Sequence, residues 1–150
     1  MPIRHPLLVD LPAVYAVEQA VFGSHVYPDF FFRQAFDLWR GLFLVADSGA
    51  GELDGYIVGA MSEEAGVLWI VSLAVRERCR GQGVGRALSI ALIAAMRARG
   101  AEAVKLTVDP GNSGAVALYS RLGFEVVGEE AAYFGEGEAR LVMRLALAGR

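Results

Sequence analysis

Residues 80–86 read Arg80-Gly81-Gln82-Gly83-Val84-Gly85-Arg86. The segment before them, residues 67–75, is rich in apolar and β-branched side chains, which is typical of a buried strand. The segment after them favours a helix from about residue 86 to residue 99, and residues 103–109 form a second β-branched run. The sequence therefore predicts strand, glycine-rich loop, helix and strand, with the two strands parallel and the crossover right-handed.

The glycine-rich loop has features of a phosphate-binding site. Gly81, Gly83 and Gly85 stand at alternate positions, and glycine lets the backbone turn sharply and approach a ligand closely. The first N–H groups of the following helix lack intrahelical partners and lie at the positive end of its dipole. Arg80 and Arg86 add positive charge. These features predict binding of a diphosphate; the alternative is a turn that serves only tight packing of the helix on the strand.

Two familiar nucleotide-binding loops do not match this segment. The dinucleotide fingerprint G-x-G-x-x-G needs glycine where Arg86 stands, and no acidic residue follows at the required distance. The P-loop needs a Gly-Lys-Ser/Thr triplet, whereas the only lysine, Lys105, lies in a predicted strand. Both nucleotide classes are therefore disfavoured.

The rest of the chain alternates between helical and strand patterns without repeats or a domain linker. Helices are expected over residues 10–22, with Asp10 as the cap, over residues 29–39 and over residues 113–122. Further strands are expected over residues 42–46, 55–61, 124–127 and 140–147. We expect a single α/β domain that spans residues 1–150.

Charge is unevenly distributed along the chain. The net charge is −3, but residues 76–105 hold seven cations and two acids, a local balance of +5. A long polyanion needs many phosphate contacts over a broad surface, so nucleic acid is not an expected partner. A small anionic ligand is favoured instead; the alternative is that these arginines form a solvated helix face.

Several classes of protein and site are disfavoured by composition. The longest apolar stretch, residues 65–75, is much shorter than the ~20 residues of a membrane-spanning helix, so no membrane partner is expected. Cys79 stands alone, which excludes an internal disulfide, and no metal site is expected because the two histidines lack clustered partners. With no export signal at the N-terminus, the expected location is the cytoplasm.

A second motif follows the second strand of the predicted unit. Residues 109–124 read Asp109-Pro110-Gly111-Asn112-Ser113-Gly114-Ala115-Val116-Ala117-Leu118-Tyr119-Ser120-Arg121-Leu122-Gly123-Phe124. At about 100° per residue, Asn112, Ala115 and Tyr119 fall on one face of a helix. Such a face can line a groove; the alternative is an amphipathic helix whose tyrosine packs at the edge of the core.

Together the two motifs resemble those of the GNAT superfamily of N-acyltransferases. The first matches R-x-x-G-x-G after a strand, and the second matches N-x-x-A-x-x-x-Y-x-x-x-G-F; the resemblance covers about residues 67–124. It implies a GNAT-like α/β (α+β) fold, with flanking helices and a mixed, mostly antiparallel sheet that splays near a central parallel strand pair. It also implies acetyl-CoA as cosubstrate and no metal.

The resemblance implies a role for each matching residue. Backbone groups of Leu73 and Val75 would hold the thioester carbonyl and the pantetheine, with the Leu73 amide as an oxyanion donor. The pyrophosphate would be bound by Arg80, Gly81, Gln82, Gly83, Val84, Gly85 and Arg86. Asn112 would contact the pantetheine arm, beside Ala115 on the same helix face. Tyr119 would act as general acid near the sulfur, because a phenol hydrogen bond stabilises a departing thiolate with a pKa near ~8.5.

The base that removes the proton of the acceptor amine is not assigned. Some members of the superfamily place a glutamate on the strand before the loop, where Trp69 stands here, or on the next strand, where Thr107 stands. A water chain is one alternative. An α-amine with a pKa of ~7.7 to 8.0 is more easily deprotonated than a lysine at ~10.4. The absence of a glutamate therefore favours an α-amine as the acceptor.

Other segments resemble the ribosomal-protein alanine N-acetyltransferases of the superfamily. These are His25-Val26-Tyr27-Pro28, Tyr133-Phe134 and Glu138-Ala139-Arg140-Leu141-Val142-Met143. His25, Tyr27 and Tyr133 are therefore the expected substrate residues. We expect direct acetyl transfer to a primary amine, such as a protein N-terminus, by a monomer or homodimer. The alternatives are acetylation of a polyamine, amino acid or aminoglycoside, and a non-catalytic acyl-CoA-binding sensor.

Overall fold

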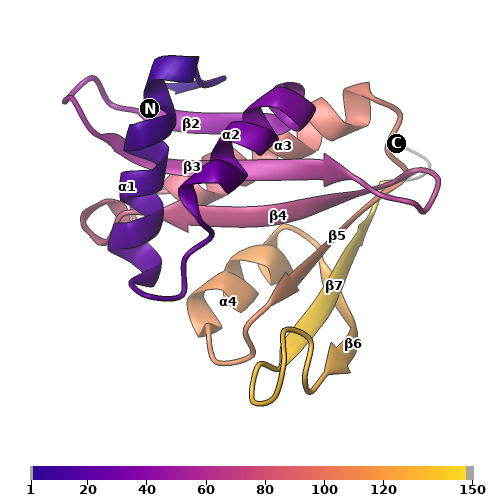
Figure 1. Ribbon diagram of the computed structural model, residues 1–150. Helices are drawn as coiled ribbons and strands as arrows, with labels where there is room; N and C mark the ends of the chain where they lie inside the picture. Colours follow the sequence, from indigo (N-terminus) through magenta and orange to yellow (C-terminus); the bar gives the residue numbers. More distant parts are fainter. Residues whose placement is uncertain (1, 148–150) are drawn as a thin grey trace.

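Residues 2–147, which the computed structural model describes, fold into a sheet flanked by helices (Figure 1). The strands are β1 (Ile3–Arg4), β2 (Phe43–Asp47), β3 (Leu53–Met61), β4 (Val67–Val75), β5 (Ala103–Val108), β6 (Glu125–Glu130) and β7 (Arg140–Ala146). The α-helices are α1 (Leu11–Phe22), α2 (Asp29–Trp39), α3 (Val84–Ala98) and α4 (Ser113–Arg121). Short 3-10 turns are η1 (Leu8–Asp10), η2 (Arg40–Leu42) and η3 (Glu77–Cys79).

The sheet has the order β1-β2-β3-β4-β5-β7-β6. Only β4 and β5 pair in parallel, and all other neighbours are antiparallel. This confirms the predicted fold class, a mostly antiparallel mixed sheet with a central parallel pair. The two-residue strand β1 was not predicted, because so short a segment carries no alternating pattern.

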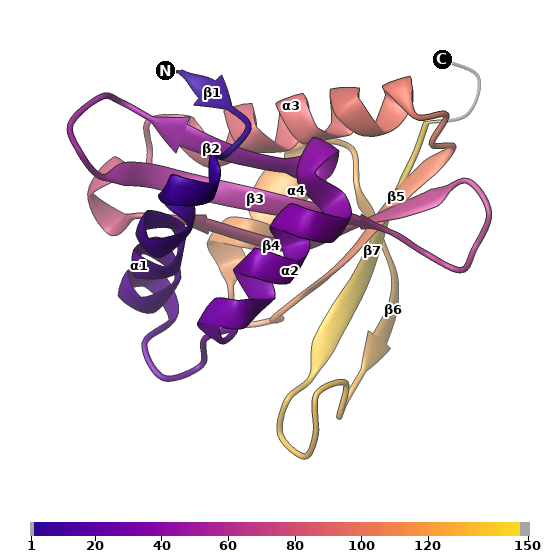
Figure 2. The ribbon, with the colours of Figure 1, turned by 45° about the horizontal axis from the view of Figure 1, so that its top comes forward.

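Helices cover both faces of the sheet (Figure 2). On one face, α1 and α2 pack Val14, Val17 and Phe32 against Tyr56 and other buried side chains of β2 and β3. On the other face, α3 and α4 pack against β3, β4 and β5 in a second core. No described helix combines the length and apolar character needed to cross a bilayer.

The parallel pairing between β4 and β5 is short. It covers three residue pairs, from Val67 with Ala103 to Trp69 with Lys105. Beyond these pairs, β4 continues along β3 while β5 continues along β7, so the two halves of the sheet diverge (Figure 1). A bulge at Val71 increases the local twist of β4, since the pairing with β3 skips this residue. The expected splay is therefore present, and it opens the middle of the sheet.

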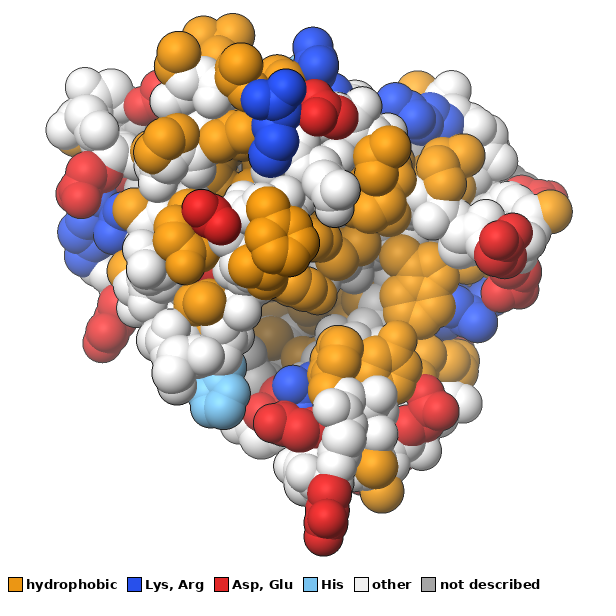
Figure 3. All heavy atoms as spheres, viewed as in Figure 1, with side chains coloured by type: hydrophobic (Ala, Val, Ile, Leu, Met, Phe, Trp, Pro, Cys, Tyr) orange, Lys and Arg blue, Asp and Glu red, His pale blue; other side chains and the backbone are white. Residues whose placement is uncertain are grey.

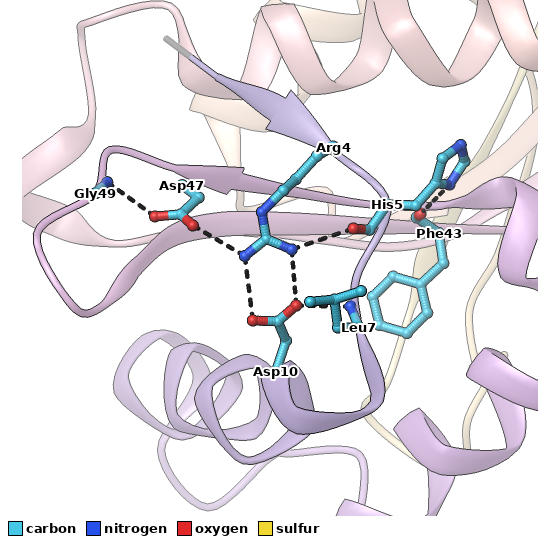
Figure 4. Close-up of polar contacts among 7 residues, drawn as sticks. All are labelled: Arg4, His5, Leu7, Asp10, Phe43, Asp47 and Gly49. Atoms are coloured by element: carbon cyan, nitrogen blue, oxygen red, sulfur yellow. Dashed lines mark hydrogen bonds and ion pairs between the residues drawn. The ribbon is translucent and has the colours of Figure 1, made fainter.

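An ion-pair cluster anchors the start of the chain to α1 and β2 (Figure 4). The Arg4 guanidinium donates to both carboxylate oxygens of Asp10, at 2.7 and 3.1 Å, and to Asp47 at 2.9 Å. Asp10 stands at the cap position of α1, as expected, but its carboxylate makes no capping hydrogen bond, because it bonds to Arg4 and to the Leu7 amide instead. Since η1 leads directly into α1, the backbone of Asp10 is already helical, whereas a capping residue is normally extended.

Candidate functional site

A cleft of about 700 Å³ lies between the diverging strands β4 and β5. Figure 3 shows this hollow on the face of the molecule, with hydrophobic side chains on its walls. Its lining includes Glu18, Val21, Phe22, His25, Val26, Tyr27, Ile70, Val71, Ser72, Leu73, Leu106, Thr107, Val108, Asp109, Asn112, Ala115, Tyr119, Phe134, Glu138 and Arg140. Another hollow, of about 670 Å³, lies between α3 and the β6–β7 pair and contains none of the predicted site residues.

The glycine-rich loop lies at the start of α3, as predicted. Gly81 and Gly83 have φ angles of +80° and +81°, which other residues rarely adopt, and a Cβ at either position would have no atom within 4 Å. Gly83 is the residue directly before α3. The open space and the free N–H groups of the first helical turn therefore fit a diphosphate.

Gly85 connects the loop to the cleft. A Cβ on Gly85 would lie 3.4 Å from Leu118 of α4, 3.6 Å from Val75 and 3.8 Å from Leu73 of β4. Leu73 itself lines the cleft, whereas Val75 does not. The loop therefore lies beside the end of β4 and next to α4, so a single extended ligand can contact both loop and cleft.

Two arginines of the loop are available to an anion. Arg80 and Arg86 are exposed, and within residues 2–147 neither forms an ion pair. Arg80 donates from Nε to the Val75 carbonyl at 3.3 Å, so one backbone group of Val75, a residue expected to hold the cosubstrate, already has a partner. Gln82 donates to the Arg78 carbonyl at 3.3 Å, and Val84 is buried in the core. These contacts position the loop and leave its arginine charge facing solvent.

The polar face of α4 lies along the cleft. Asn112, Ala115 and Tyr119 all line it, in agreement with the face worked out from the helical period. Asn112 also caps the helix, because its Oδ1 accepts from the Ala115 amide at 3.1 Å. Tyr119 packs against Phe124 with ring centroids 5.4 Å apart. Burial raises the pKa of Tyr119, so its phenol stays protonated at any ordinary pH.

The other end of the cleft is formed by the α1–α2 loop and the β6–β7 loop. His25 and Tyr27 line it, and the Tyr27 ring stacks on Phe31 at 4.2 Å. From the β6–β7 side, Phe134 lines the cleft, and Tyr133 packs edge-on behind it at 4.7 Å. The structure thus brings two of the three predicted substrate residues into the cleft wall and places Tyr133 beside it.

Arg140 carries a compensated charge at this end of the cleft. Its guanidinium lies 3.6 Å from the Glu138 carboxylate and 5.0 Å from the centroid of the Phe134 ring. It also donates to the Ala139 carbonyl at 2.7 Å. Because Glu138 is 43% exposed, water reaches this ion pair. The charges of Arg140 and Glu138 therefore largely cancel at this end of the cleft.

Glu18 is the cleft residue that the sequence reasoning missed. It lies on α1 with only 1% of its surface exposed, and its carboxylate accepts from the Tyr27 amide at 2.8 Å and from the Tyr56 hydroxyl. Burial raises the pKa of Glu18. The signal was available, because Glu18 shares the buried face of α1 with Val14 and Val17. A carboxylate on such a face needs a partner or a function.

Neither of the two positions where members of the resembled superfamily carry a glutamate has an acidic side chain here. Thr107 lines the cleft, and Trp69 lies at the last parallel pair of β4 and β5. Within residues 2–147, no group of three or more histidine, cysteine or acidic side chains has the geometry of a metal site. The only buried carboxylate in the described part of the cleft wall is Glu18.

Comparison with known proteins gives consistent similarities. The acetyltransferase (GNAT) family matches residues 11–124, which include both motifs. The chain is 32% identical over 152 residues to an N-alpha-acetyltransferase of Sulfurisphaera tokodaii, with 94% of this chain and 90% of that protein covered. It is 33% identical over 140 residues to the L-methionine sulfoximine/L-methionine sulfone acetyltransferase of Pseudomonas aeruginosa, with 85% and 81% covered.

A solved structure extends the comparison to three dimensions. The ribosomal-protein-S18-alanine N-acetyltransferase of Escherichia coli superimposes with a TM-score of 0.84, at 25% sequence identity. The match covers 99% of this chain and 95% of that one. The similarity therefore includes the terminal strands as well as the central motifs.

Proposed function

The chain belongs to the acetyltransferase (GNAT) family, and on that premise we propose that it transfers the acetyl group of acetyl-CoA to the α-amine of a protein N-terminus. The observation that carries the proposal is the proximity of three features: a cleft between separated strands, Tyr119 in its wall, and the open glycine loop beside it, next to Leu73. Each has a distinct task in acyl transfer from a thioester. A packing motif alone would not need them together.

The binding roles follow from the position of each group. The N–H groups at the start of α3, with Arg80 and Arg86, would bind the diphosphate through charge-assisted hydrogen bonds. Asn112 and Ala115 would lie along the pantetheine arm, and the backbone of Leu73 would contact the thioester carbonyl. Acetyl-CoA would supply an acetyl thioester, which an amine can attack directly.

Two groups of the chain would then stabilise charge during the reaction. The amide of Leu73 would donate to the carbonyl oxygen as that oxygen becomes negative. Tyr119 would donate to the sulfur as the carbon–sulfur bond breaks. The raised pKa of Tyr119, caused by burial, makes it a weak acid, so its main contribution would be a hydrogen bond to the developing thiolate.

An α-amine is supported as the acceptor by the residues and by the relatives. At pH 7, an α-amine is neutral in roughly a tenth of molecules and a lysine in well under 1%. The Sulfurisphaera relative is named as an N-alpha-acetyltransferase. The Pseudomonas relative, named for methionine derivatives, favours an amino-acid-like amine as the second candidate. Both acceptors present a primary amine close to a carbonyl group.

The proposal is tested with radiolabelled acetyl-CoA, a panel of short peptides with free N-termini, and a panel of small amines. We expect label on the peptides, and mass spectrometry should locate it on the α-nitrogen. The matched control is the same peptide with a blocked N-terminus and one internal lysine. Label only on small amines would support the second candidate. Binding of acetyl-CoA without turnover of any amine would support the sensor instead.

A further inference from the structure

A hydrogen-bonded chain of three side chains runs from the cleft into the core between α1 and the sheet. Ser72 on β4 lines the cleft, and its Oγ lies 2.7 Å from the phenol oxygen of Tyr56 on β3. The Tyr56 hydroxyl donates to Oε1 of Glu18 on α1. Tyr56 and Glu18 are buried, whereas Ser72 is half-buried. The hydrogen-bonded side chains therefore connect a half-buried hydroxyl of the cleft wall to a carboxylate that also borders the cleft and has 1% of its surface exposed.

The direction of these hydrogen bonds follows from the protons available. A phenol carries one proton, and Tyr56 donates it to Glu18. Burial, and then the neighbouring carboxylate, raise the pKa of Tyr56 well above its ordinary value, so the resting phenol is neutral and presents its proton to Glu18. The Ser72 hydroxyl must then donate to Tyr56, which leaves lone pairs of Ser72 Oγ to accept from a group in the cleft. Every proton of the chain points toward Glu18.

We infer that Glu18 is the proton acceptor for the incoming amine, reached through the hydroxyls of Ser72 and Tyr56. The inference rests on the proposed function, in which the thioester carbonyl lies at Leu73, the residue next to Ser72. An ammonium group hydrogen-bonded to Ser72 would be adjacent to the carbon that it must attack. The missing base of the reaction is thereby assigned to α1 rather than to β4 or β5.

The proton balance of this step is complete. One ammonium proton passes to Ser72 Oγ, the Ser72 proton passes to Tyr56, and the Tyr56 proton passes to Glu18. The neutral amine forms the new carbon–nitrogen bond, and the sulfur leaves with the electron pair of the carbon–sulfur bond. The second nitrogen proton passes to the sulfur, which the Tyr119 hydroxyl stabilises by a hydrogen bond while it carries negative charge. Glu18 returns its proton to water, so ammonium and thioester give amide, thiol and one proton.

The other carboxylates of the cleft are less suited to this role. Glu138 is 43% exposed and paired with Arg140, and Asp109 is exposed and accepts from the Gly111 amide at 2.9 Å. Burial raises the pKa of Glu18, which increases its affinity for a proton. Further titratable groups face the cleft from the neighbouring elements, namely His25 and Tyr27 from the α1–α2 loop and Tyr119 from α4.

The test compares two forms of one acceptor peptide. The first has an ordinary α-amine, and the second has an aminooxy group in its place, which is uncharged at neutral pH and needs no base before attack. For Glu18→Gln at pH 7, we expect kcat/KM with the amine peptide to fall by about 10²- to 10³-fold and kcat/KM with the aminooxy peptide to fall far less. For the variant, kcat/KM with the amine should rise with pH up to the pKa of the amine itself.

Matched variants distinguish loss of the hydrogen-bonded path from general effects of substitution. Tyr56→Phe and Ser72→Ala interrupt the chain without removing the carboxylate, so each should also slow the amine peptide more than the aminooxy peptide. Tyr15→Phe, on α1 but outside the cleft, and Glu63→Gln, in the exposed β3–β4 turn, should leave both rates unchanged. Equal losses on both peptides for Glu18→Gln would overturn the inference, because a structural defect does not distinguish the two nucleophiles.

A second readout needs no turnover. A carboxylate whose folded-state pKa is raised destabilises the fold as the pH rises above its unfolded value of ~4.3. The free energy of unfolding of Glu18→Gln, relative to the unmodified protein, should therefore increase from about that pH and level off above the folded pKa. A difference independent of pH would contradict the inference. If the unmodified protein acetylates no amine, the proposed function fails; if it does so and Glu18→Gln matches it, only the inference fails.

Discussion

Replacing Gly83 by alanine tests whether the loop before α3 binds the diphosphate, and Gly100 provides a matched control at the other end of the same helix. Both glycines have left-handed backbones, with φ of +81° and +84°. At both positions a Cβ would find no atom within 4 Å. The two substitutions therefore introduce the same backbone strain without any steric clash in the free protein.

The expected loss of stability follows from that strain. A left-handed conformation costs a non-glycine residue about 1–2 kcal/mol. For a chain of this size, this corresponds to a fall in Tm of about 2 to 8 °C. Because both positions are otherwise open, Gly83→Ala and Gly100→Ala should lower the Tm by similar amounts, as measured by differential scanning calorimetry.

Binding of acetyl-CoA should separate the two variants. At Gly83 the added methyl group lies where the diphosphate would approach the backbone, whereas Gly100 is at the far end of α3. We expect the Kd of Gly83→Ala to rise at least ~10-fold, or about 1.4 kcal/mol, and that of Gly100→Ala to stay unchanged. Isothermal titration calorimetry measures both. Equal affinities of the two variants for acetyl-CoA would refute the assignment of the loop as the diphosphate-binding site.

Three further predictions concern the thiol leaving group and the stability of the fold. Tyr119→Phe should lower kcat by ~10- to 100-fold in a steady-state assay while the Kd of acetyl-CoA is retained, and an unchanged kcat would remove the acid role. Gly55→Ala brings a Cβ to 2.7 Å from the Ala74 carbonyl oxygen, a backbone atom that yields little, and should cost about 1–3 kcal/mol in urea unfolding. Its control, Gly128→Ala in β6, meets no atom within 4 Å and should be neutral or stabilising by ~0.4–1 kcal/mol; equal losses would contradict the steric argument. Hydrogen bonds from its arginine partner hold the pKa of Asp10 below its ordinary value (Figure 4), so this carboxylate stabilises the fold above pH ~3.9 and loses that effect as the pH falls through the lower folded pKa. Unfolding of Asp10→Asn should therefore show a deficit near neutral pH that shrinks in acid, and a deficit independent of pH would count against the ion pair.

The sequence was informative wherever a feature depends on neighbouring residues. The predicted bounds of α2 (Asp29–Trp39) and β4 (Val67–Val75) agree with the structure, because hydrophobic period and terminal residues are local signals. The shared face of Asn112 and Tyr119 follows from helix geometry alone. The two motifs also indicated the family, because each has its required residue types within a short stretch.

Other features required the tertiary structure. Glu18, Tyr56 and Ser72 are separated by 38 and 16 positions, and only the packing of α1 on β3 and β4 brings their side chains together. The partner of Asp10 likewise depends on where β1 pairs with β2. Local sequence determines helices, strands and backbone turns, because these depend on short-range sterics and hydrogen bonds. Which side chains line the cleft depends on contacts between distant segments. These contacts are determined only when the whole sheet has formed.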